Sequence, residues 1–203
     1  MDNWRERYAS KIITAQEAAS HIKNGDRIYL GSMCSEPGVI IDALAKSGLE
    51  DVEIIQFSSG CKAVELSPDG YKRFRLKSFF VGGKKCEIGE PLEADYVPLF
   101  HSQIPDFLRN RRIPVDVAIV QVAEPDRFGR FSLGISVDIA LSAVESARMV
   151  IAQVNPRMPR TLGDTSVLFD RIDYLVEGEE ELFELPEENL GDREKTISRF
   201  CSE

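Results

Sequence analysis

The sequence predicts an α/β fold in which helices flank a mostly parallel β-sheet on both sides. Helix and strand signals alternate along most of the 203 residues, as they do where helices connect parallel strands. The apolar stretch 115–122 is continuous rather than alternating, which is typical of a strand covered on both faces. At this length the chain fits one large domain or two small ones, and it can bury a core without disulfides or metal ions.

The first half of the chain contains start signals for two helices. Thr14 and Glu17 form a capping-box pattern, and Gly25 is a usual residue at a helix end. Pro37 stands where a second helix is expected to begin, because proline is favoured in the first helical turn. The elements expected here are, in order, helix 14–24, strand 27–30, loop 31–36, helix 37–47, and strands 52–57 and 74–81.

The second half continues the alternation and then changes character. The acidic stretch 177–188 is predicted to be a solvated linker, and a helix pattern begins at Asp192 and is cut by the end of the chain. We therefore expect a domain at 1–185, with 186–203 as a linker and the start of a further C-terminal domain. The elements expected before the linker are strand 96–100, helix 102–112 capped by Ser102, strand 115–122, helix 137–147, and strands 149–154 and 172–176.

Charge and cysteine content exclude several function classes. The formal net charge is −9, which disfavours nucleic acid as a partner. No apolar run approaches the roughly 20 residues that span a bilayer, so we expect no membrane partner. The four cysteines form no C-x-x-C pair, and the two histidines are far apart, so no metal site is expected. With no hydrophobic signal core at the N-terminus, we predict a reduced, cytoplasmic protein.

The loop that follows the first strand is a candidate ligand site, because ligands in parallel sheets bind beyond the carboxyl ends of the strands. Residues 31–37 join a strand to a helix, and their N–H groups are suited to holding a carboxylate or oxyanion. The alternative is an ordinary turn. Cys34 is expected to have a lowered pKa near a helix N-terminus, although a lone cysteine is more often structural. Ser58 and Ser59 follow the second strand in the same way.

A second candidate loop, 129–138, joins the continuous apolar strand to a helix. Ser132 and Ser136 are suited to hydrogen bonding a substrate, or Ser136 simply caps the helix. Asp138 is expected in the first helical turn, where a carboxylate is favoured by the helix dipole. The polar loop with Arg157 and Arg160 either binds an anion or fastens the loop to the domain, and His101 either faces a ligand or caps a helix.

Taken together, these segments resemble the acetyl-CoA hydrolase/transferase family, which includes 4-hydroxybutyrate and acetate CoA-transferases. The resemblance runs through nearly the whole chain, and its specific part is 125–138 followed by 154–161 and 172–174. Supporting matches are 31–37, 80–83, 94–98 and 103–105. The family implies a CoA-transferase-like N-terminal domain within a protein of about twice this length, built from two similar α/β halves.

The resemblance also implies a reaction. In this family a glutamate attacks an acyl-CoA thioester and passes through a glutamyl-CoA intermediate in a ping-pong transfer. That glutamate lies in the C-terminal half, so no catalytic residue is assigned here. The alternatives are an acyl-CoA hydrolase and, from a different class, a non-catalytic binding module.

The implied substrates are acyl-CoA and short carboxylic acids, with coenzyme A thioester as substrate and no tightly bound cofactor. The implied protein partners are the chain's own C-terminal domain and further copies in a homo-oligomer. By position, the residues expected to line the substrate pocket are Ser32, Met33, Cys34, Glu36, Ser58, Ser59, Ser132, Gly134 and Ser136.

Overall fold

The computed structural model describes residues 4–58, 62, 66, 73–80, 94–184 and 191–202. The helices are α1 (Trp4–Arg7), α2 (Ala15–Ser20), α3 (Gly38–Ala45), α5 (Ile104–Arg109), α6 (Ala140–Ser146) and α7 (Asp192–Ser202). The 3₁₀ turns are η1 (Ala9–Lys11), η2 (Met33–Ser35), η3 (His101–Gln103) and η4 (Phe169–Arg171). The strands are β1 (Arg27–Leu30), β2 (Val52–Gln56), β3 (Phe74–Ser78), β4 (Asp95–Tyr96), β5 (Val117–Val122), β6 (Arg130–Ser132), β7 (Met149–Val154), β8 (Ser166–Leu168) and β9 (Tyr174–Glu177).

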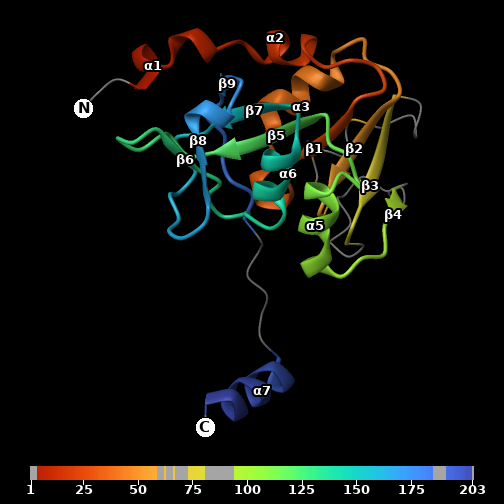
Figure 1. Ribbon diagram of the computed structural model, residues 1–203. Coiled ribbons are helices and arrows are strands. Elements are labelled where there is room, and N and C mark those ends of the chain that lie inside the picture. The colour runs from red at the N-terminus through yellow and green to blue at the C-terminus, as the bar shows by residue number, and fades with distance from the viewer. Residues whose placement is uncertain are drawn as a thin grey trace.

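One sheet of seven strands organises the domain (Figure 1), and its order is β4-β3-β2-β1-β5-β7-β9. Every pairing in this sheet is parallel. The chain starts near the middle of the sheet, builds outward through β2, β3 and β4, and returns to β5 beside β1. The loops after β1 and β5 therefore leave neighbouring strands in opposite directions along the sheet. Such a switch point is where open α/β sheets usually bind ligands.

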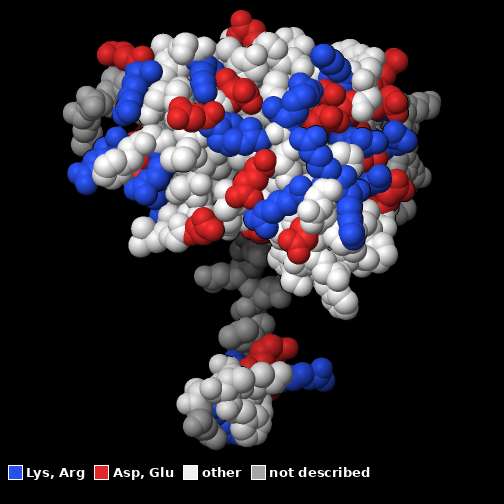
Figure 2. Space-filling model, viewed as in Figure 1, with Lys and Arg blue, Asp and Glu red and all other residues white. Residues whose placement is uncertain are grey.

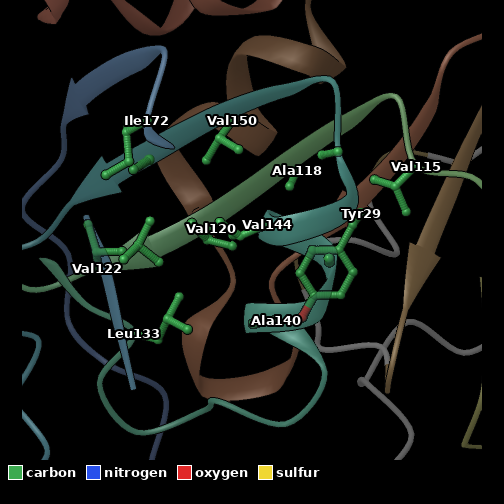
Figure 3. Close-up of a cluster of buried hydrophobic side chains, with 14 of the residues drawn as sticks. Tyr29, Val115, Ala118, Val120, Val122, Leu133, Ala140, Val144, Val150 and Ile172 are labelled. Carbon is green, nitrogen blue, oxygen red and sulfur yellow. The ribbon is translucent and has the colours of Figure 1, made fainter. Parts of the chain in front are cut away.

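The two faces of the sheet carry separate apolar clusters. One face packs against α5 and α6, through residues such as Leu108 and Ala143, and Figure 3 shows part of this cluster between β5, β7 and α6. The other face packs against α2 and α3, through residues such as Ala18 and Leu44. All residues of β5 and β7 are buried, which explains their continuous apolar sequences. The predicted fold class is therefore confirmed.

Several element boundaries differ from the sequence prediction. The first helix ends at Ser20 rather than near Gly25, although its predicted capping box is present. The helix expected at 137–147 begins only at Ala140. The strand expected at 96–100 is confined to Asp95–Tyr96, since Tyr96 and Phe100 are exposed and lack the buried face that would extend the pairing. Ser102 makes no cap, because it lies inside η3.

A two-stranded antiparallel sheet was not predicted. It pairs β6 with β8, and the register places Phe131 opposite Val167. Both side chains are buried, and the rings of Trp4 and Tyr8 pack on Phe131. With three residues per strand and 33 residues between Ser132 and Ser166 in sequence, the pairing leaves no local periodic signal. The N-terminal segment and this small sheet thus stabilise each other by a long-range contact.

The first residues of the acidic stretch that was predicted to be a solvated linker, 177–180, make contacts with the domain. Glu177 ends β9 and pairs with Arg5, and the Glu180 side chain is only 19% exposed. Glu180 is held because its carboxylate accepts hydrogen bonds from buried donors of β7 and α3. The residues at the predicted boundary between 185 and 186 lie outside the described residues, so that boundary stays a prediction. α7 forms as expected, with Ile197 and Phe200 exposed.

Candidate functional site

The loop after β1 is tightly constrained at the carboxyl edge of the sheet. The Gly31 N–H donates to the Ile119 carbonyl of β5, at 2.9 Å. A Cβ at Gly31 would collide with the Ser35 backbone carbonyl, so the turn requires glycine here. Met33 adopts a φ of 49°, in the left-handed region that residues with side chains rarely occupy. Such constrained backbone is common at functional sites.

Four buried amide side chains connect this loop with the ends of the neighbouring strands. Gln56, Gln121, Gln153 and Asn155 are at most 3% exposed. The Gln121 amide donates to the Glu36 carbonyl at 2.6 Å, and its own carbonyl accepts from Asn155 at 2.7 Å. The sequence analysis missed these residues. The available signal was a polar residue in or directly after three apolar strands, 52–57, 115–122 and 149–154, where burial requires a hydrogen-bonding partner.

Glu36 is the carboxylate at the centre of the first loop. Its side chain accepts hydrogen bonds from the Gln56 amide at 3.3 Å and from the Lys62 N–H at 3.1 Å. The Lys62 ammonium in turn pairs with Glu180 at 2.6 Å. A Cβ at Gly38 would meet both of these charged groups, which ties the start of α3 to the same cluster. The predicted residue Glu36 is therefore built into a network that reaches from β2 to the segment after β9.

Two buried polar atoms of this region have no hydrogen-bond partner among the described residues. They are the Gln56 side-chain carbonyl and the Ser35 hydroxyl. The amide nitrogen of Gln56 is already committed, because it donates to the Gly31 carbonyl and to Glu36. An unsatisfied buried acceptor costs about 1–3 kcal/mol, so atoms of this kind are suited to accepting a ligand's donor.

Ser32 and Ser58, the predicted substrate-pocket serines that follow the first and second strands, lie close together at this edge. The Phe57 N–H donates to the Ser32 hydroxyl at 3.1 Å, and Ser58, the next residue, is buried. Ser32 is itself 1% exposed, so its hydroxyl joins the two loops rather than facing solvent. Ser59 lies outside the described residues. The predicted pair of loops is thus brought together by the Ser32 hydroxyl.

Tyr29 connects the first loop to the second candidate loop. Its phenol donates to the Asp138 carboxylate at 3.1 Å, and Figure 3 shows the Tyr29 ring lying across the sheet toward Ala140. The same carboxylate accepts from the Ile139 and Ala140 N–H groups at the start of α6. Burial raises the pKa of Tyr29, and the negative charge of Asp138 raises it further. The Asp138 carboxylate, rather than the Ser136 hydroxyl, therefore accepts from the N–H groups that precede and begin α6.

Ser136 belongs to the same cluster. Its hydroxyl lies 3.5 Å from the second Asp138 oxygen, and the residue is half-buried. Asp138 has a φ of 28°, outside the helical region, so it precedes the helix instead of lying in its first turn as predicted. Of the predicted residues in the second loop, Ser136 is the one that the contacts link to Tyr29.

Burial raises the pKa of Asp138 above its ordinary value of 3.8, against the opposing effect of its hydrogen bonds from Ile139, Tyr29 and Ala140. A raised pKa means that the folded state binds the proton more readily than the unfolded chain. This carboxylate therefore adds stability as the pH falls through its folded pKa toward about 4, and it costs stability above that range.

The substitution Asp138→Asn tests this pH dependence, because it keeps one acceptor oxygen and removes the charge. We expect the difference in melting temperature, variant minus wild type, to be most positive near pH 7 and to decrease toward about pH 4. Thermal melts across this range measure it. Asp170→Asn, at an exposed position, is the matched control for the change of charge. A constant difference between Asp138→Asn and wild type would contradict the proposed burial effect.

The pKa of Cys34 is raised, which corrects the prediction that it is lowered. Burial of the thiol raises it first, and the charge of Glu36 adds to the effect, although a backbone hydrogen bond opposes both. The helix whose dipole was expected to lower the pKa begins only at Gly38. Cys34 is therefore mainly a protonated thiol at neutral pH and a weak nucleophile.

Ser132 and Gly134 form a separate cluster with the loop after β7. The Ser132 hydroxyl accepts from the N–H groups of Gly134 and Thr161, both at 3.2 Å, and the residue is fully buried. Gly134 has a φ of 70° and packs against Met158. These contacts favour a role in holding the loop, and substrate binding by this pair stays a prediction.

The arginines of the loop after β7 form ion pairs and hydrogen bonds with other residues of the domain. Arg157 pairs with Glu179 at 3.2 Å and with Glu181 at 2.5 Å. Arg160 donates to the carbonyls of Glu124 and Arg130. Of the two alternatives left open by the sequence, these contacts favour fastening of the loop over anion binding.

His101 faces an aromatic neighbour. Its ring stacks on Phe57, directly after β2, with centroids 4.3 Å apart.

Within the described residues, no group of three or more acidic, cysteine or histidine side chains is arranged to hold a metal ion. The same part of the chain contains no helix that is long and apolar enough to cross a membrane.

Comparisons with known proteins agree with this geometry. The sequence profile of the acetyl-CoA hydrolase/transferase N-terminal domain matches residues 1–185. The 4-hydroxybutyrate coenzyme A transferase of Clostridium kluyveri is 40% identical over 205 residues, which is 98% of this chain and 47% of that protein. The butyryl-CoA:acetate CoA-transferase of Anaerostipes caccae is 33% identical, over 87% of this chain and 41% of that protein.

A solved structure shows the same architecture. RipA from Yersinia pestis superposes with a TM-score of 0.85 at 28% identity, over 100% of this chain and 50% of that chain. The chain thus spans about half the length of the relatives it matches. By the match over most of its length, the chain belongs to the acetyl-CoA hydrolase/transferase family, as a copy of its N-terminal domain.

Proposed function

We propose that this chain is the N-terminal half of a CoA-transferase that moves coenzyme A between a short-chain acyl-CoA and a carboxylate, of the 4-hydroxybutyrate/acetate type. The observation that carries the proposal is the family match over 1–185, together with relatives that are named CoA-transferases. The buried amide network at the switch point of the sheet supports it, because it provides a constrained polar wall for an acyl or carboxylate group.

The reaction we propose is a ping-pong transfer through a glutamate of the C-terminal half. The carboxylate attacks the thioester carbonyl and expels CoA thiolate, which leaves an acyl-glutamyl anhydride. The thiolate then attacks the glutamyl carbonyl and releases the first carboxylate, which leaves glutamyl-CoA. The acceptor carboxylate attacks this thioester, forms a new anhydride and frees the thiolate, which attacks the acyl carbonyl to give the new acyl-CoA and free glutamate. Covalent catalysis divides one difficult exchange into easier steps.

The N-terminal half would position these groups. The loop with Ser32, Met33, Cys34 and Glu36, together with Ser58, is our candidate wall, and Ser136 extends it through Tyr29 and Asp138. The Gln56 carbonyl would accept a hydrogen bond from the ligand. The relatives are about twice as long as this chain, which supports a C-terminal domain as its partner. A cytoplasmic location, a homo-oligomer and the absence of a tightly bound cofactor stay predictions.

A chimera tests the proposal. The matched N-terminal portion of the Clostridium kluyveri enzyme, 47% of its length, is replaced by this chain. We expect the chimera to transfer CoA from butyryl-CoA to acetate and to form acetyl-CoA, as followed by chromatography of both thioesters. The chain alone should form none, since the proposed glutamate is outside it. Transfer by the isolated chain, with a cooperative melt confirming that it is folded, would contradict our placement of the nucleophile.

The same assay separates transfer from hydrolysis. A hydrolase releases CoA from butyryl-CoA without acetate, whereas a transferase requires the acceptor. Within the chimera, Ser136→Trp is expected to block transfer without lowering the melting temperature, because Ser136 is half-buried at the proposed pocket. Ser20→Trp, at an exposed position of α2, is the control and should retain activity. Equal activity of the two variants would show that Ser136 does not line the substrate site.

A further inference from the structure

A pocket lies on the sheet face that carries α5, away from the loops described above. Its volume is about 260 Å³, and it opens between the strands β1, β2 and β3 and the segment that joins α5 to β5. It includes no residue of 31–36, of 132–136 or of the buried amide network. The pocket is slightly smaller than the range of about 300–1,000 Å³ typical of drug-sized ligands. It is therefore suited to a small molecule.

Three cations and one carboxylate line the pocket. Arg27, Lys77 and Arg112 carry positive charge, and Glu53 is the carboxylate. Glu53 is 13% exposed and pairs with Lys77 at 2.7 Å and with Arg27 at 3.7 Å. The formal sum is +2, in a chain whose net charge is −9. In Figure 2, Lys and Arg lie over the half of the viewed face that carries α5, β3 and β4 in Figure 1, with acidic residues between them, and others lie over the opposite half.

Arg112 is the cation of this set that forms no ion pair within the described residues. Its guanidinium lies over the Phe107 ring of α5, 5.2 Å from the ring centroid. The segment that carries it is held in place, because the Ile113 N–H donates to the Phe107 carbonyl at 3.1 Å. Arg112 is therefore a positioned guanidinium at the rim of the pocket, and such groups bind carboxylates well.

The other walls of the pocket are apolar. Ile55 and Phe79 are buried side chains of the main core, and Val97, Ile113 and Pro114 complete the lining. A hydrated inorganic anion gains nothing from such walls, whereas a hydrocarbon chain gains about 25 cal/mol for each Å² buried. The pocket thus combines a cationic rim with an apolar interior.

We propose that this pocket binds a small monocarboxylate with a short hydrocarbon chain, at a site separate from the candidate functional site. The carboxylate lies against Arg112 and Lys77, and the chain lies against Ile55, Phe79 and Ile113. Glu53 keeps the two strand cations in place when the pocket is empty. The proposal is independent of the proposed CoA transfer, because it concerns binding to this chain alone.

Titration of the ¹⁵N-labelled chain with sodium butyrate, followed by NMR, tests the proposal. We expect saturable shifts of the amides of Lys77 and Ile113, compared with sodium chloride at equal ionic strength. Arg112→Gln and Lys77→Met are expected to raise the dissociation constant at least about tenfold, because each removes a charged hydrogen bond to the ligand. Arg75→Gln is the matched control. It removes one charge from the same face of β3, two residues from Lys77 and outside the pocket lining, and should change the constant less than about twofold.

Two results would overturn the proposal. Equal shifts with inorganic phosphate or chloride would show general anion attraction, and shifts confined to 31–36 and 132–136 would place butyrate at the candidate functional site alone. Arg112 is exposed, so its variant tests binding even if Lys77→Met disturbs the Glu53 pairing. Failure of the chimera assay with pocket binding intact would reject the proposed function and leave this inference standing.

Discussion

The substitution Gln153→Ala is expected to lower the free energy of unfolding by about 2–4 kcal/mol. Gln153 is fully buried at the end of β7. Its carbonyl accepts from the N–H groups of Val39 and Ile40 at the start of α3, and its amide donates to Glu180 at 2.6 Å. Alanine leaves a cavity, weakens the hydrogen bonding of the α3 N-terminus and removes a donor from a largely buried carboxylate.

Urea denaturation and thermal melts measure this loss. In a chain of this size, the expected change corresponds to about 5–15 °C in melting temperature. Gln16→Ala provides the matched control, since Gln16 is exposed on α2, and it should stay within about 0.5 kcal/mol of wild type. If the two variants lose the same stability, the buried amide network does not stabilise the carboxyl edge of the sheet.

A comparable loss is expected for Gly134→Ala, in the second candidate loop. Gly134 has a φ of 70°, and an added Cβ would collide with the Met158 side chain and lie 3.3 Å from the Pro159 carbonyl. The backbone conformation costs about 1–2 kcal/mol for a residue with a side chain, and overpacking adds about 1–3 kcal/mol. The total is about 2–5 kcal/mol, measured by the same denaturation experiment.

Other glycines of the chain separate the two contributions. Gly25 has a φ of 82° with open space around it, so Gly25→Ala should show the backbone cost alone. Gly48 has neither constraint, and its alanine variant should be close to neutral. In a double-mutant cycle, Met158→Ala should recover part of the Gly134→Ala loss, because the two residues are in contact. Strictly additive losses would argue against the collision.

The candidate site was predictable in part. Loop positions after apolar strands led to Ser32, Glu36 and Ser58, because the carboxyl ends of parallel strands share one edge of the sheet. The same reasoning also selected Ser132, whose buried hydroxyl holds its own loop together. Position along a strand says where a loop begins, and it does not say whether a side chain faces a ligand or a neighbouring backbone.

The buried amides show a second limit of prediction from sequence, which is that a side chain's partner cannot be identified from its neighbours. Gln121 and Gln153 each stand within an apolar strand, and their sequence neighbours give no indication of a partner. Their partners are Glu36, Asn155 and Glu180, which come from other segments of the chain. The solvated linker was predicted for the same reason, since Glu180 among other acidic residues has the composition of a solvent-exposed segment.

By itself, the sequence determined the fold class, most strand positions, the capping box at Thr14 and the family of the domain. The first three follow from patterns within about ten residues, where period, turn residues and caps act on their neighbours. The family follows instead from the resemblance that runs through nearly the whole chain. The strand order, the pairing of β6 with β8 and the burial of Glu180 were decided only by the tertiary structure. Each of these depends on contacts between segments that are distant in sequence, and their free energy is gained only when the core forms around them.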